Sequence, residues 1–159
     1  MTLDDVANLG EIFGAIAVLI TLFYLAIQIR QSSAASRAQT RQALADSQIG
    51  YLNSRALDPF IRAVSMKMYL GGEMNEEEAY ALRIHLTAHI RLFENYFTQY
   101  ALGTLDEQDW LAMREVIRSQ LQFGPYREAF LNRDREKNWN ADFAAEVREI
   151  IGQIDESAA

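Results

Sequence analysis

The sequence lacks cysteine altogether, contains two prolines and eight glycines among 159 residues, and has no lysine or arginine before Arg30. Without cysteine the chain can form no disulfide bond, no thiolate metal site and no cysteine nucleophile. Because helix-breaking residues are so few and Ala, Leu, Glu, Gln and Arg are abundant, an all-α fold is expected. The net charge of −7 argues against a nucleic-acid partner, since phosphate binding depends on clustered Lys and Arg.

Motifs of catalysis are missing as well. The sequence holds no Walker or Rossmann glycine signature and no G-x-S-x-G elbow around a nucleophilic serine. Its carboxylates are scattered, without the paired Glu-x-x-His motifs that a di-iron bundle requires. We therefore predict no catalytic residue, no cofactor and no enzymatic activity.

What the sequence does contain is an uncharged apolar run of 18 residues, IFGAIAVLITLFYLAIQI, from Ile12 to Ile29. As a helix this run is about 27 Å long, close to the hydrocarbon thickness of a bilayer. A secretory signal peptide would start with a basic region, whereas here the leading segment is acidic and Arg30 follows the run directly. We predict an uncleaved transmembrane helix rather than a buried helix of a soluble domain, because core helices are rarely apolar on every face over this length.

The charges that flank this run predict its orientation. Arg30, Arg37 and Arg41 follow it within about a dozen residues, and no basic residue precedes it. The positive-inside rule then places the C-terminal part in the cytoplasm and the short N-terminus outside. The expected location is a bacterial-type inner membrane, crossed once, with the lipid bilayer as the first partner.

One sector of the predicted transmembrane helix, about 80° wide at 100° per residue, carries small and polar side chains. We call it the association stripe, and it consists of Gly10, Gly14, Ala17, Thr21, Tyr24 and Gln28. Its two glycines form a G-x-x-x-G pair, which allows close approach of helix backbones in lipid, where Thr and Gln side chains can hydrogen-bond across the contact. The stripe predicts self-association, or docking onto another membrane protein.

The helical pattern does not break after Arg30. We expect helices over residues 3–57, 60–70, 76–102, 107–122, 126–132 and 140–154, with N-caps at Asp58, Asn75 and Asp106. The expected domains are a transmembrane segment over 1–30, a helical stalk over 31–57, a cytoplasmic helical bundle over 58–154 and a tail over 155–159. A long, mostly polar stalk needs a packing partner, either copies of itself in a coiled coil or the following domain.

The most suggestive pair of side chains is His85 and His89, whose spacing puts both imidazoles on one face of a helix, as in metal-binding helices. However, the zincin motif needs a glutamate after the first histidine, where Leu86 stands, so a third ligand such as Glu94 would have to be recruited. His89 also lies within an apolar stripe. We therefore predict no metal site and favour a structural role, as a core histidine hydrogen-bonded to a partner, or a pH-sensitive one; metal binding by His85 and His89 is the less favoured alternative.

The apolar stripe around His89 is interpreted as core rather than as a cofactor pocket. Its members are Leu82, Leu86, Phe93, Tyr96, Phe97 and Tyr100. The aromatic residues expected to face it from later helices are Trp110, Phe123, Tyr126, Phe130, Trp139 and Phe143. Arg83, Arg91 and Glu94 lie off the stripe, and we expect them on the solvated side of the same helix.

The block LGEIFGAIAVLITLFYLAIQIRQ, from Leu9 to Gln31, resembles the opening of a widespread group of uncharacterised bacterial membrane proteins. These proteins share an N-terminal hydrophobic helix, an Arg- and Gln-rich helix and a helical domain that ends in segments containing Trp and Phe. The resemblance is specific over residues 9–41 and loose beyond them. It implies a single-pass bacterial protein and supplies no catalytic residue.

The functional hypothesis from the sequence is a membrane-anchored, self-assembling helical scaffold, or an accessory subunit of a larger membrane complex. The first alternative is an oligomeric pore or transport-related protein whose path Thr21, Tyr24 and Gln28 would line. The second alternative is a metal- or ligand-binding protein that uses His85 and His89.

Overall fold

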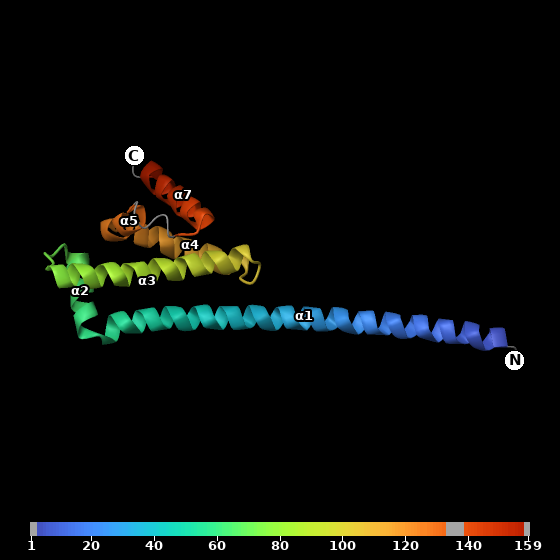
Figure 1. Cartoon of the computed structure of the whole chain (residues 1–159). Coiled ribbons are helices and arrows are strands. Elements are labelled where there is room, and N and C mark those ends of the chain that lie inside the picture. The colour runs from blue at the N-terminus through green and yellow to red at the C-terminus, as the bar shows by residue number, and fades with distance from the viewer. Residues whose placement is uncertain (1–2, 133–138, 158–159) are drawn as a thin grey trace. The chain divides into compact units, whose positions relative to one another are not determined.

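The computed structural model describes residues 3–132 and 139–157, with side chains described from Glu11 onward except that of Ile12. The described residues form six helices and no strand (Figure 1). The helices are α1 (Leu3–Leu57), α2 (Pro59–Leu70), α3 (Glu76–Ala101), α4 (Glu107–Leu121), α5 (Gly124–Leu131) and α7 (Ala141–Ser157). The predicted all-α fold is confirmed.

The chain divides into two units, an N-terminal unit of Met1–Gln39 and a C-terminal unit of Thr40–Ala159. Helix α1 supplies residues 3–39 to the first and residues 40–57 to the second. Its bounds are those predicted, because neither proline nor a run of β-branched residues interrupts the segment. It ends at Asp58-Pro59, where proline lacks the N–H that would continue the helix.

The ends of α2 and the start of α3 follow from local sequence. Asp58 caps α2, and its Oδ1 accepts hydrogen bonds from the backbone N–H groups of Phe60 and Ile61 at 2.8 and 3.1 Å. Gly71 closes α2 with φ of 69°, a left-handed conformation that favours glycine. Asn75 and Glu78 form a capping box at the start of α3. These predicted caps are confirmed.

The start of α4 differs from the prediction in its chemistry. Asp106 stands at the N-cap position, but its side chain makes no capping hydrogen bond. Its Oδ2 instead accepts a hydrogen bond from Arg41 of α1 at 2.9 Å. Asp106 therefore occupies the predicted N-cap position, but the capping hydrogen bond expected of its side chain is not formed. The last helix also continues to Ser157, three residues beyond its predicted end.

Helix α3 organises the C-terminal unit, since it packs against α2, α4, α5 and α7. The side chains between these helices and the end of α1 form one hydrophobic core. Its buried members are Leu44, Ile90, Phe93, Tyr96, Leu105, Trp110, Met113, Ile117, Leu121, Phe130, Trp139, Phe143, Ala144, Val147, Ile150 and Ile151. The aromatic residues of α3 thus belong to a packed core, as predicted.

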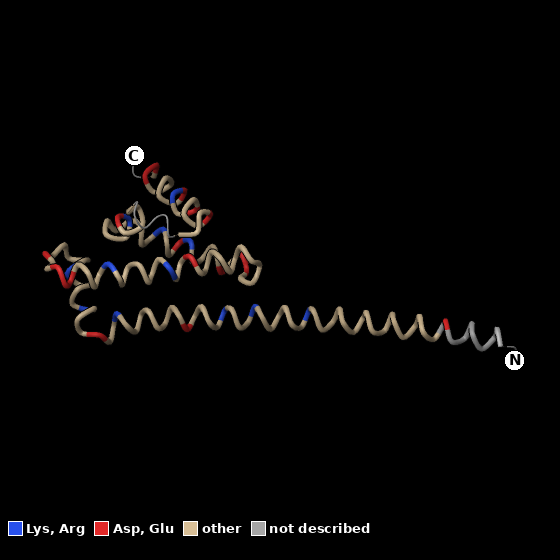
Figure 2. Tube along the Cα trace, in the orientation of Figure 1, with Lys and Arg blue, Asp and Glu red and all other residues tan. Residues whose placement is uncertain are grey.

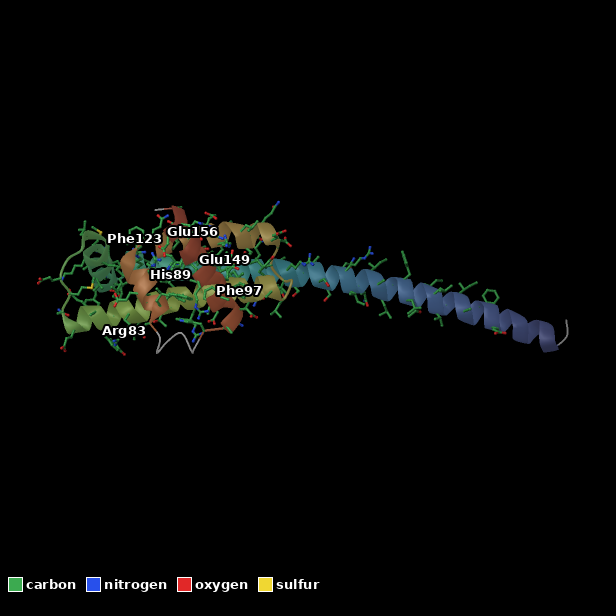
Figure 3. All side chains as sticks on the ribbon, turned by 90° about the horizontal axis from the view of Figure 1, so that it is seen from above. Arg83, His89, Phe97, Phe123, Glu149 and Glu156 are labelled. Carbon is green, nitrogen blue, oxygen red and sulfur yellow. The ribbon has the colours of Figure 1, made fainter. Side chains whose placement is uncertain are left out.

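Two expected positions are wrong. Phe123, labelled in Figure 3, was expected in the core, but it lies in the turn before α5. It is 40% exposed and packs edge-on against Tyr69 of α2. Glu94 was expected in solvent, but only 13% of its side chain is exposed. Its carboxylate accepts hydrogen bonds from the backbone N–H of Asn140 and from Arg91. Glu94 therefore joins α3 to the chain just before α7.

Candidate functional site

The N-terminal unit presents its apolar residues outward. Every described side chain from Phe13 to Gln39 is exposed, and Phe23 reaches 71% exposure. Figure 2 shows that the part of this helix between Glu11 and Arg30 carries no charged residue. By length and composition, α1 can cross a membrane, and none of its apolar stretch is buried.

The association stripe lies on this exposed helix, although the surroundings of Gly10 are outside the described residues. A Cβ added at Gly14 would meet nothing within 4 Å, so packing within the chain does not require a glycine there. Thr21 donates its hydroxyl hydrogen to the carbonyl oxygen of Ala17 at 2.8 Å, and Gln28 donates an amide hydrogen to the Tyr24 hydroxyl at 3.0 Å. The stripe therefore partly satisfies its own polar groups.

Polar side chains of the C-terminal unit gather around the two histidines of α3. Tyr51, from the end of α1, has its ring centroid 4.4 Å from that of His85 and 3.9 Å from that of His89. The phenol ring is within 22° of parallel to the first imidazole and within 18° of the second. On the same face of the phenol ring, two imidazoles at these distances would overlap each other, so they must stack on its opposite faces. Tyr51 is therefore inserted between His85 and His89.

A short hydrogen-bonded chain continues from this three-ring stack. The Nδ1 atom of His89 lies 2.7 Å from the hydroxyl of Tyr126 on α5, and that hydroxyl lies 3.1 Å from the hydroxyl of Tyr51. His89, labelled in Figure 3, is only 7% exposed. Tyr51, His89 and Tyr126 thus join α1, α3 and α5 through side chains that hydrogen-bond and stack at once.

Burial sets the protonation of this cluster. It lowers the pKa of His89 from 6.5 to about 3, with smaller contributions from the charges of His85 and Arg55. It also lowers the pKa of His85 and raises that of the Tyr51 and Tyr126 hydroxyls. At neutral pH the cluster therefore holds neutral imidazoles and protonated phenols.

The two histidines do not converge on a common point. A metal ion bound by both would need each ring nitrogen about 2 Å away, and the Tyr51 ring stands between the imidazoles. Among the described residues no group of three or more histidine, aspartate or glutamate side chains could hold a metal ion. The Nε2 of His85 is buried without a hydrogen-bond partner in the described part of the chain. The arrangement joins helices α1, α3 and α5.

His89 does have the hydrogen-bond partner that the sequence analysis expected of a core histidine, although the sequence did not identify it as Tyr126. The contribution of Tyr51 was missed. The spacing of Leu44, Gln48, Tyr51 and Arg55 at helical intervals could have indicated that this face of α1 packs inward. No protein-family model, curated protein sequence or solved structure matches the chain.

Proposed function

We propose that this protein is a single-pass inner-membrane protein without catalytic activity, which serves as a self-assembling scaffold or as an accessory subunit of a larger membrane complex. The observation that carries this proposal is the unburied apolar stretch of α1, which ends at Arg30. Exposed apolar area of this extent is unfavourable in water and favourable in a bilayer. The cytoplasmic side holds Arg37 and the C-terminal unit, and the N-terminus lies outside.

The association stripe supports assembly within the membrane. A glycine inside a helix costs about 0.5–1 kcal/mol relative to alanine, and the open space around Gly14 shows no compensating contact within the chain. A second helix that approaches closely would supply one. Within α1 the side-chain amide of Gln28 donates to the Tyr24 hydroxyl. The side-chain amide oxygen of Gln28 and the hydroxyl hydrogen of Tyr24 are not used in that bond, so both can form hydrogen bonds across such an interface.

Topology can be tested directly because the chain has no cysteine. We expect a membrane-impermeant maleimide added to intact cells to label a Thr2→Cys variant and to leave a Ser157→Cys variant unlabelled until the membrane is opened. Labelling of Ser157→Cys in intact cells would contradict the orientation. Recovery of the protein in the soluble fraction after cell breakage would contradict the membrane anchor itself.

Assembly can be tested by crosslinking and native mass spectrometry in mild detergent. We expect Gly14→Leu to reduce the oligomer or complex, because a leucine side chain keeps helix backbones apart. Ala26→Leu is the matched control, since it makes a comparable enlargement on the opposite side of the same helix. Either a monomeric wild-type protein without partners or an equal effect of the two substitutions would rule out assembly through the stripe.

A further inference from the structure

An open groove of about 400 Å³ lies between the start of α2 and the exposed side of α3. Phe60 of α2 forms one wall, and Tyr80 and Ile84 of α3 form the other. All three are large hydrophobic side chains with substantial exposure, 42%, 56% and 52%. Apolar side chains gathered in one concave site are typical of an interaction surface, whereas isolated exposed ones are not.

The lining residues of α3 follow the helical spacing. Glu77, Tyr80, Ile84 and Ala88 lie at intervals of three and four residues, so they form one row of about three helical turns. The short side chains of Ala81 and Ala88 also line the groove, which leaves room for the side chains of a partner. A straight row of this length matches an amphipathic helix that inserts apolar residues at similar intervals.

The charge at one end of the groove defines the partner further. Glu77 lines the groove at the first turn of α3, and Glu73 and Glu76 lie next to it, all exposed and without a cationic partner among the described residues. Figure 2 shows this acidic cluster at the start of α3. Arg83 lies over the Tyr80 ring, with its guanidinium carbon 5.0 Å from the ring centroid, and lines a different pocket of α3 beside Leu82 and Leu86. A partner helix with basic residues at one end would complement this surface.

We propose that this groove binds a basic amphipathic helix from the cytoplasmic flank of another membrane protein. The inference rests on the proposed function, which puts the C-terminal unit in the cytoplasm. Cytoplasmic flanks of membrane helices are enriched in Lys and Arg, so they carry the charge that the acidic end of the groove selects. Apolar residues of the partner fill the space beside Phe60, Tyr80 and Ile84, and its basic end pairs with Glu77.

The direct test measures binding of two fluorescent peptides to the full chain in nanodiscs of uncharged lipid, with empty nanodiscs subtracted. Both peptides are amphipathic Leu/Ser helices of about four turns, one with arginines at its end and the other with glutamates. We expect the arginine peptide to bind at least about tenfold more tightly, and this preference to weaken at high salt. Equal binding of the two peptides, or no binding of either, would overturn the proposal.

Variants show whether binding occurs in the groove. We expect Ile84→Glu to weaken binding of the arginine peptide about tenfold or more, and Glu77→Lys to shift the preference toward the glutamate peptide. Leu111→Glu, at a similarly exposed leucine on α4, is the matched control and should bind as wild type does. Unchanged binding in Ile84→Glu overturns the proposal.

A photo-crosslinking residue at position 80 then tests the occupant in cells. Sequenced crosslinks to a basic segment beside a transmembrane helix of another protein support the proposal, whereas crosslinks to a second copy of this chain or to lipid overturn it. Maleimide labelling and the oligomeric state of the same variants report on the proposed function separately, so its failure can be told apart from failure of the groove.

Discussion

Phe23 in the N-terminal unit and Phe143 in the C-terminal unit are the same side chain in opposite surroundings, 71% exposed in one and 0% in the other. Both lie on helices, and both have apolar neighbours at helical spacing. Around Phe143 the apolar residues occupy one face, so packing against α3 and α4 removes them from water. Around Phe23 they surround most of the helix, so no single neighbouring helix could cover them. The pattern around Phe143 is typical of a helix that packs on a core, whereas the pattern around Phe23 is compatible with a membrane-spanning helix.

Substitution of these two phenylalanines gives the largest expected contrast. Phe143→Ala should destabilise the C-terminal unit by about 3–5 kcal/mol because it leaves a cavity in a packed core. Phe23→Ala should leave the stability of that unit within about 0.5 kcal/mol of wild type. Denaturant unfolding in mild detergent, followed by tryptophan fluorescence, measures the difference, since Trp110 and Trp139 both lie in the C-terminal core.

An equal loss of stability in both variants would contradict this contrast and would show that the N-terminal unit takes part in the same cooperative transition. Unchanged stability in Phe143→Ala would contradict the assignment of Phe143 to the core.

The histidine cluster predicts the next largest effect, a dependence of stability on pH that is confined to the C-terminal unit. The unfolded chain binds a proton on His89 near pH 6.5, whereas the folded protein binds it only near pH 3. The contribution of the neutral His89 to the free energy of unfolding is therefore fully present above pH 6.5 and is progressively lost as the pH falls toward 3. Between pH 7.5 and pH 5 the loss from His89 is about 2 kcal/mol.

The check is denaturant unfolding at several pH values with wild type and His89→Gln. Glutamine keeps a polar side chain opposite Tyr126 but cannot titrate. We therefore expect the stability of the His89→Gln variant to change less with pH over this range than that of wild type, whatever the stability of the variant at pH 7.5. A pH dependence equal to that of wild type would show that His89 titrates normally. His85→Gln provides the matched comparison one turn away, where the imidazole is less buried.

Local features of this fold could be predicted from the sequence, and features that depend on distant residues could not. The caps at Asp58 and Asn75 were correctly predicted because the partners of each carboxylate or amide lie within three residues. Asp106 has the same local signal, but Arg41, 65 positions away, binds its carboxylate. A rule based on neighbouring residues cannot predict a contact with that arginine.

The same distinction applies to the candidate site. Helical spacing correctly indicated that His85 and His89 share a face and that His89 lies among apolar side chains. It could not show that Tyr51 enters between the two rings, because this depends on how α1 and α3 align within the C-terminal unit. Burial of Glu94 was missed for a similar reason, since its partner Asn140 lies 46 residues away.

Charges show the contrast between exposed and buried surroundings on a smaller scale. Arg41 lies 2.9 Å from Asp106 and 2.6 Å from Asp109, but 59% of its side chain is exposed. Arg114 pairs with Glu146, and only 16% and 22% of these two side chains are exposed. Water screens the exposed pairs of Arg41, so their loss costs little. Removal of one partner from the more buried Arg114–Glu146 pair leaves a charge that water solvates poorly, which costs more.

Arg41→Ala should therefore lower the stability only slightly, and less than Arg114→Ala does, and this small effect should shrink further in high salt. Arg114→Ala should cost about 1–3 kcal/mol, because Glu146 is left partly buried without its donor, and Arg114→Ala with Glu146→Ala should recover part of that loss. Denaturant unfolding of the three variants at low and high salt measures both effects. A larger loss in Arg41→Ala than in Arg114→Ala would mean that attachment of α1 to α4 through the exposed pair, rather than burial of charge, limits the stability of the C-terminal unit.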